Sequence, residues 1–210
     1  PLSVITDPAE AGPHLQGPDC FVSVKCLRKQ VFQGKISTAP PESAHSVDVC
    51  KRKVSVSKAL LSEFLGSSQS YLLDEDVFLV EIFAGEHAKL SRAVEEDGRR
   101  AIRLGLAWGQ DFRIKQHRAL AIELVKYVQP DHVHVSWQCT CVAGFSNLNY
   151  EKHEWKREEM DRDREMVGNW INMYGDIHMI QHEAGRFCHG ENPEKSLAWL
   201  HPRWYHLPGL

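Results

Sequence analysis

From about residue 77 onward, short apolar runs alternate with longer stretches in which apolar residues have helical spacing. The first run, Val77 to Phe83, is apolar except for Glu81 and ends at Ala84-Gly85. Such a run is typical of a strand buried on both faces of a parallel sheet. Shorter apolar runs predict further strands over 101–104, 132–137 and 186–189.

Between these runs, apolar residues recur every three or four positions. This spacing predicts helices that open at Glu86 and His87 and close at Gly98, and further helices over 116–128 and 158–184. Strands that alternate with helices of this length form parallel sheets with right-handed crossovers. The sequence therefore predicts the α/β fold class, with a Rossmann-like parallel sheet in a domain over residues 76–210.

Residues 1–75 have a different pattern and are expected to form an irregular N-terminal extension. The segment begins with frequent Pro and Gly, which predicts an extended arm. Alternating apolar residues predict a hairpin of strands over 21–27 and 31–36, and 54–65 has helical spacing. The Gly- and Ser-rich stretch 66–70 predicts a linker to the α/β domain.

Composition and charge are those of an ordinary globular protein. The 210 residues include 25 Lys and Arg and 28 Asp and Glu, which gives a formal net charge of −3, and 42% are hydrophobic. A chain of this size can bury a substantial core. The charge excludes a broad basic surface as the main means of binding nucleic acid, although a local basic groove is compatible with it. No stretch approaches the ~18 apolar residues of a membrane span, so no span is expected.

The cysteines and the first residues bear on location. Six cysteines are present and no signal peptide precedes them, so we expect reduced thiols and an intracellular protein. Because the sequence begins with Pro1 rather than Met, removal of a targeting segment would make an organelle a second possible location.

The ends of the predicted strands carry the candidate chemistry, because parallel sheets bind ligands at the carboxyl ends of their strands. After the first strand, Glu81-Ile82-Phe83-Ala84-Gly85 leads directly into a helix. A small residue and a glycine let the backbone approach a ligand, and the helix start offers free N–H groups to an anion. This segment resembles the first motif of class I S-adenosylmethionine-dependent methyltransferases.

Three further segments resemble motifs of the cytosine-C5 methyltransferases within that family. The segment 136–140, Ser-Trp-Gln-Cys-Thr, is similar to the Pro-Cys motif, with Gln138 in place of proline. Glu191-Asn192-Pro193 is similar to the Glu-Asn-Val motif, and Asp111 lies where the family has an acid near the adenine ring. The order and spacing of all four segments agree with the family.

The nearest overall pattern is that of methyltransferase-like domains in algal retroelement-type polyproteins, and the resemblance covers residues 77 to about 204. It implies S-adenosylmethionine as the cofactor. The residues that would bind this cofactor are Glu81, Phe83, Ala84, Gly85 and Asp111. The resemblance also implies that Cys139 is a nucleophile for C6 of a flipped cytosine and that Glu191 engages the cytosine N3.

Departures from the family pattern predict a degenerate site. Residues 103–108, after the second strand, contain no carboxylate for the ribose hydroxyls, and His87 replaces the second glycine of the first motif. Two functions therefore stay open. One is a degenerate methyltransferase-like domain with nucleic acid as the candidate partner. The other is a non-catalytic subunit that uses the fold as a scaffold among protein subunits of a larger assembly.

Other residues have plainer interpretations. Cys139 and Cys141 are equally consistent with small apolar residues at a strand end. The pairs His178/His182 and His132/His134 have the spacing of metal ligands on a helix and on a strand. Because the chain has neither a Cys-x2-Cys pair nor a His-Glu-x2-His motif, we expect partly exposed histidines and no metal.

Overall fold

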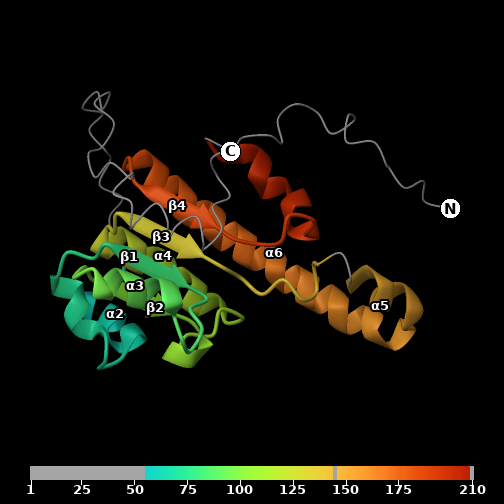
Figure 1. The fold of residues 1–210 in the computed structure, drawn as a ribbon, viewed down its shortest axis with the longest axis horizontal. Helices are drawn as coiled ribbons and strands as arrows, with labels where there is room; N and C mark the ends of the chain where they lie inside the picture. Colours follow the sequence, from blue (N-terminus) through green and yellow to red (C-terminus); the bar gives the residue numbers. More distant parts are fainter. Residues whose placement is uncertain (1–54, 144–145, 209–210) are drawn as a thin grey trace.

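The computed structural model describes residues 55–143 and 146–208, with the backbone alone for 147–149. Its centre is a four-stranded, all-parallel sheet in the order β2-β1-β3-β4 (Figure 1). The strands are β1 (Leu79–Ile82), β2 (Ala101–Leu104), β3 (His132–Val135) and β4 (Phe187–Gly190). The predicted α/β fold class with a Rossmann-like parallel sheet is confirmed, and the predicted hairpin over 21–36 lies outside the described residues.

Helices connect the strands as the sequence predicts. The connecting helices are α3 (Lys89–Glu96) between β1 and β2, α4 (Lys115–Val128) between β2 and β3, and α5 (Ser146–Lys152) with α6 (Glu154–Glu183) between β3 and β4. Helix α2 (Lys58–Leu65) precedes the sheet. Short 3-10 helices complete the described part: η2 (Ser70–Asp74), η3 (Leu106–Trp108), η4 (Leu197–Leu200) and η5 (Pro202–His206).

The two faces of the sheet differ in what covers them. One face carries fully buried aliphatic residues, such as Val80, Ile82 and Val133, which pack in one core with residues of α4 and α6. On the other face, Leu79 and Ala101 pack under α3 in a smaller cluster. Where β3 and β4 form that second face, the sheet carries histidines and a phenylalanine instead of aliphatic residues.

Residues before β1 belong to the same packed body. Leu61 and Leu65 of α2 are buried in the main core. Gln69 is 3% exposed, and its side-chain amide exchanges two hydrogen bonds with the backbone of Arg103 at 2.9 and 2.8 Å. Because β2 is an edge strand in the described sheet, Gln69 satisfies backbone groups that would otherwise lack partners. The prediction of a linker over 66–70 is therefore wrong.

The histidines of β3 also differ from expectation. His132 is 4% exposed and His134 is 1% exposed, so both are buried rather than partly exposed. Strand spacing predicts which residues share a face, but it does not reveal whether that face is covered.

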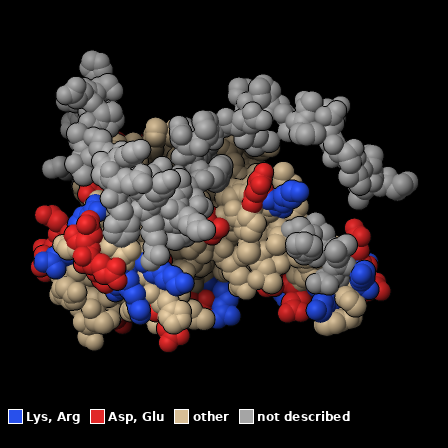
Figure 2. Space-filling view, in the orientation of Figure 1, with Lys and Arg blue, Asp and Glu red and all other residues tan. Residues whose placement is uncertain are grey.

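Helix α6 is longer than the sheet requires. It begins four residues before the predicted start, and its first half, together with α5, extends away from the sheet (Figure 1). Trp155 on this part is 71% exposed. Among the described residues, no helix is long and apolar enough to cross a membrane. In the view of Figure 2, basic and acidic side chains are interspersed, in keeping with the small net charge.

The chain segments that follow β1 and β2 approach each other closely. The Ala84 N–H donates to the Leu104 carbonyl at 2.8 Å, which continues the pairing of the two strands. A Cβ atom on Gly105 would lie only 2.5 Å from the Ala84 carbonyl oxygen. Gly105 is therefore required by a backbone contact rather than by its φ angle.

We predict that Gly105→Ala destabilises the fold by about 1–3 kcal/mol, because a backbone atom must move to admit the new methyl group. Gly85→Ala is the matched control, since a Cβ on Gly85 meets nothing within 4 Å. Its effect should stay within about 0.5 kcal/mol. Urea unfolding measures both, and equal stability of the two variants would contradict the contact.

Candidate functional site

The strand order reverses direction between β1 and β3. From β1 the chain moves outward to β2, and it then returns across β1 to form β3 on the other side. In open parallel sheets, ligands bind at such a reversal, beyond the carboxyl ends of the strands. The loop after β1 carries Phe83, Ala84 and Gly85, Cys139 follows β3, and Glu191 follows β4. The topology thus brings these residues to one edge of the sheet.

The backbone after β1 is strained and anchored. Phe83 has φ 64° and Ala88 has φ 35°, in the left-handed region that side chains disfavour. The Phe83 ring packs against Phe112 and Trp170, with ring centroids 4.9 Å away in each case. Packing of this aromatic group offsets the backbone strain. Non-glycine residues with such φ values often lie at ligand sites.

Gly85 is the open point of this loop. It is exposed, a Cβ atom there would meet nothing within 4 Å, and its carbonyl accepts a hydrogen bond from Trp108 Nε1 at 3.3 Å. Ala84 beside it is buried, at 3% exposure. Within the described residues, no hydrogen bond uses the backbone N–H groups of Gly85, Glu86 and His87. These exposed donors lie directly before α3.

Glu81 has a structural partner instead of a place in this site. Its side chain accepts hydrogen bonds from the backbone N–H of Ser91, at 2.9 Å, and from the Ser91 hydroxyl. Ser91 lies in the first turn of α3, where backbone N–H groups lack partners within the helix. Glu81 is 7% exposed, and its buried hydrogen bonds to Ser91 fasten the start of α3 to strand β1.

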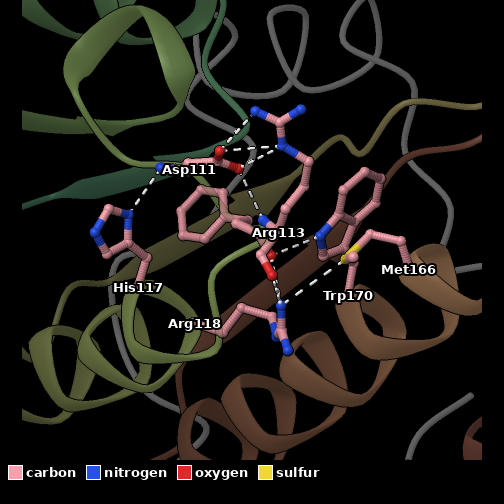
Figure 3. A network of polar contacts seen from close by, with 7 residues as sticks. Asp111, Arg113, His117, Arg118, Met166 and Trp170 are labelled. Atoms are coloured by element: carbon pink, nitrogen blue, oxygen red, sulfur yellow. Dashed lines mark hydrogen bonds and ion pairs between the residues drawn. The ribbon is translucent and has the colours of Figure 1, made fainter. Parts of the chain in front are cut away.

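Asp111 is also engaged, as Figure 3 shows. Its carboxylate accepts hydrogen bonds from the Arg113 side chain at 2.7 to 3.0 Å and from the Arg113 backbone N–H at 2.9 Å. Its own N–H donates to His117 Nδ1 at 2.8 Å. The hydrogen bonds from Arg113 lower the pKa of the Asp111 carboxyl below its usual value. An adenine amino group would have to compete with Arg113 for this carboxylate.

A clamp fixes the segment that contains Asp111 to α6. The Phe112 carbonyl accepts hydrogen bonds from Arg118 Nη1 at 2.7 Å and from Trp170 Nε1 at 2.9 Å (Figure 3). Arg118 Nη1 also donates to the Arg113 carbonyl at 2.8 Å. Because Phe83 packs on both Phe112 and Trp170, the clamp also positions the loop after β1. No motif in the sequence signals this arrangement.

Cys139 and Glu191 lie in loops that are tied together. The Glu191 N–H donates to the Val135 carbonyl at 2.9 Å, and Asn192 Nδ2 donates to the Trp137 carbonyl at 3.3 Å. Cys139 and Glu191 are both half-buried. In the described part of the chain, neither the Cys139 sulfur nor the Glu191 carboxylate takes part in a hydrogen bond or ion pair. Neither side chain has a polar partner there, and Cys139 packs against the main core.

Cys141 lies two residues after Cys139. Burial raises the pKa of its thiol, so less of it is present as the reactive thiolate. Its carbonyl accepts hydrogen bonds from Ser146 Oγ at 2.9 Å and from Arg164 Nε at 3.3 Å. Cys141 therefore anchors the turn after β3.

Trp108 is the site residue that the motifs do not predict. It follows β2, where the family that the chain resembles has its ribose-binding acid. Its indole ring stacks with the Arg103 guanidinium, whose Cζ atom lies 5.1 Å from the ring centroid. Arg103 also forms an ion pair with Glu95. Nearby, Leu106 is 72% exposed. The end of β2 therefore offers aromatic and aliphatic surface rather than a carboxylate.

A cavity of about 440 Å³ lies elsewhere, at the amino ends of the strands. It is lined by the last residue of α4 and by residues that lie shortly before β1, β2 and β3: Asp76, Val77, Phe78, Gly98, Arg99, Arg100, Val128, Gln129 and Asp131. Among the described residues, no group of three or more His, Cys, Asp or Glu side chains is placed to hold a metal ion.

We predict that Glu81→Ala lowers the free energy of unfolding by about 2–3 kcal/mol, because it removes buried hydrogen bonds to a charged group at the start of α3. Glu96→Ala at the exposed end of the same helix is the control and should change stability by less than about 0.5 kcal/mol. Chemical denaturation checks this prediction. A Glu81→Ala protein as stable as the control would show that the carboxylate is not holding α3.

Comparison of the chain with models of protein families, with curated proteins and with solved structures finds no match. The similarity to methyltransferases therefore rests on the four sequence motifs. These motifs follow the strands of the parallel sheet, whose order reverses between β1 and β3.

Proposed function

We propose that the chain is an S-adenosylmethionine-binding domain of the methyltransferase type, related to the cytosine-C5 enzymes and with a degenerate catalytic edge. One observation supports it most. The loop after β1 stands at the reversal of the strand order, and its backbone is held in an unfavourable conformation at Phe83 while Gly85 stays open. Backbone strain that is maintained by the surrounding packing, as at Phe83, clusters at active sites and ligand sites.

The residues of this edge fit such a cofactor. The free N–H groups of Gly85, Glu86 and His87 would hold its carboxylate, as the start of a helix does for anions. The Trp108 indole offers apolar surface beside Gly85 for the adenosine part, and Leu106, two residues before it, is exposed. When bound, S-adenosylmethionine supplies a methyl group on a sulfonium.

Two side chains that have no polar partner among the described residues support a link to cytosine chemistry. The Cys139 thiolate would add to C6 of the base, and the Glu191 carboxyl group would hydrogen-bond at N3. The two groups follow neighbouring strands, and Asn192 ties their loops together. Against efficient catalysis, Glu81 and Asp111 are engaged with Ser91 and Arg113. We therefore propose that methyl transfer is slow.

A second candidate function is a non-catalytic interaction subunit. The observation that favours it is the extension formed by α5 and the first half of α6, which leaves Trp155 71% exposed. A helix that extends beyond the core in this way is a common means of contact with a partner. The two functions differ in whether the cofactor binds.

Calorimetric titration with S-adenosylmethionine and S-adenosylhomocysteine tests the proposal. We expect micromolar binding that Gly85→Trp abolishes, because the indole would fill the open space beside the loop. Gly85→Ala should bind almost normally, and Glu96→Trp, on an exposed turn of α3, is the control for introducing an indole. If a folded sample gives neither heat nor a thermal shift at millimolar ligand, the proposal is refuted in favour of the interaction subunit.

Residual methyl transfer to cytosine-containing DNA or RNA should depend on Cys139. We predict that Cys139→Ser abolishes transfer but changes cofactor affinity by less than about twofold. The substituted sulfur atom belongs to the loop after β3, whereas the cofactor is expected to bind at the loop after β1. Cys141→Ser, two residues away, should retain transfer because burial keeps that thiol protonated. Transfer assays with a radioactive methyl group measure both. Equal activity of the two variants would rule out Cys139 as the nucleophile.

A further inference from the structure

A cluster of histidine rings joins β3 to β4 on the face of the sheet opposite the main core. His132 Nδ1 lies 3.5 Å from His189 Nε2 across the two strands. The His132 ring lies between Phe78 and Phe187, with ring centroids 4.7 and 4.9 Å away. The His132 ring is thus packed between the strands, whereas His189 is half-buried and Phe187 is 43% exposed.

His134 completes the cluster. It pairs in register with His189, is 1% exposed, and its Nδ1 has no hydrogen-bond partner among the described residues. A buried imidazole without a partner is tolerated more readily when neutral than when charged.

Among the described residues, the charged and titratable groups that act on the cluster repel a positive charge there. The Arg99 guanidinium lies over the Phe78 ring, 3.8 Å from its centroid, and repels a charge on His132. From α6, His178 repels a charge on His189. Glu81 is in register with His134, but its carboxylate is bound to Ser91.

All three rings therefore favour the neutral form. Burial lowers the pKa of His132, His134 and His189 to about 4 in each case. Repulsion from Arg99 lowers the pKa of His132 further, and repulsion from neighbouring histidines contributes at His134 and His189.

We propose that His132, His134 and His189 form an acid-sensitive clasp that holds the edge strand β4 on the sheet. Within the described sheet, β4 pairs only with β3, so it is an edge strand, as β2 is on the opposite side, and the histidine contacts lie in its one pairing. Glu191 directly follows β4, and its N–H bonds the Val135 carbonyl. Opening of the clasp would therefore displace Glu191 from the edge that carries Cys139. This inference does not depend on cofactor binding.

The sign of the effect follows from the pKa values. In the released state each imidazole returns to a pKa of about 6.5, whereas in the folded state its pKa is about 4. The released state thus binds more protons between these values, so β4 is secure at neutral pH and loosens as the pH falls below about 6.5. Each imidazole contributes up to about tenfold per pH unit to the opening constant, and three contribute up to about a thousandfold.

Hydrogen exchange of the full chain at pH 7.5 and pH 5.0, corrected for intrinsic exchange rates, tests the clasp. We expect the opening constant of the peptide over 186–191 to rise at least a hundredfold more than that of the β1 peptide over 79–82. If both peptides keep their protection, or if both lose it together, the clasp is refuted, because β4 is then not released selectively.

His189→Gln gives an independent test, because it removes one titrating ring and keeps a polar side chain of similar size. For each unit by which the pH falls, the opening constant of β4 in this variant should rise about tenfold less than in the wild type. His87→Gln, at an exposed position, is the control and should show the pH dependence of the wild type. An unchanged pH dependence in His189→Gln would overturn the assignment of His189. If this variant fails to fold, the wild-type exchange experiment decides alone.

Discussion

The backbone carbonyl of Phe112 is the point on which the candidate site depends. It accepts hydrogen bonds from Trp170 of α6 and Arg118 of α4, and so joins two helices to the segment that follows β2. The Phe83 ring packs on Phe112 and on Trp170. Since Phe83 has a positive φ, this packing is what keeps the loop after β1 in its unfavourable conformation. Loss of a hydrogen bond to the Phe112 carbonyl would therefore alter the position of Gly85, although neither donor is hydrogen-bonded to Gly85 in the described part of the chain.

The carboxylates of this chain divide into structural and uncommitted groups. Glu81 and Asp111, which the motifs assign to a cofactor, bind Ser91 and Arg113 and so stabilise α3 and the segment before α4. Among the described residues, the Glu191 carboxylate, at the carboxyl edge, has no hydrogen-bond or ion-pair partner. The exposed backbone N–H groups after β1 and the Trp108 indole are what the edge offers a ligand. A site built in this way would bind mainly through backbone and apolar contacts.

The sequence predicted the elements well and the side-chain partners poorly. The strand over 101–104 and the parallel sheet followed from periodicity, because hydrophobic spacing reflects the burial of whole elements. Gln69, in a stretch that was predicted to be a linker, binds the β2 backbone instead, and His132 and His134 are buried. Such outcomes depend on which groups meet after folding. Neither composition nor spacing contains that information.

The most direct test of the central claim is to locate the cofactor on the protein. Amide chemical shifts of the isotopically labelled chain can be followed as S-adenosylhomocysteine is added. We expect the shifts to change at Gly85, Glu86 and His87 and at the Trp108 indole, with little change at the cavity lined by Phe78 and Arg99. Changes confined to that cavity, or none at all in a folded sample, would contradict binding of the cofactor at the loop after β1.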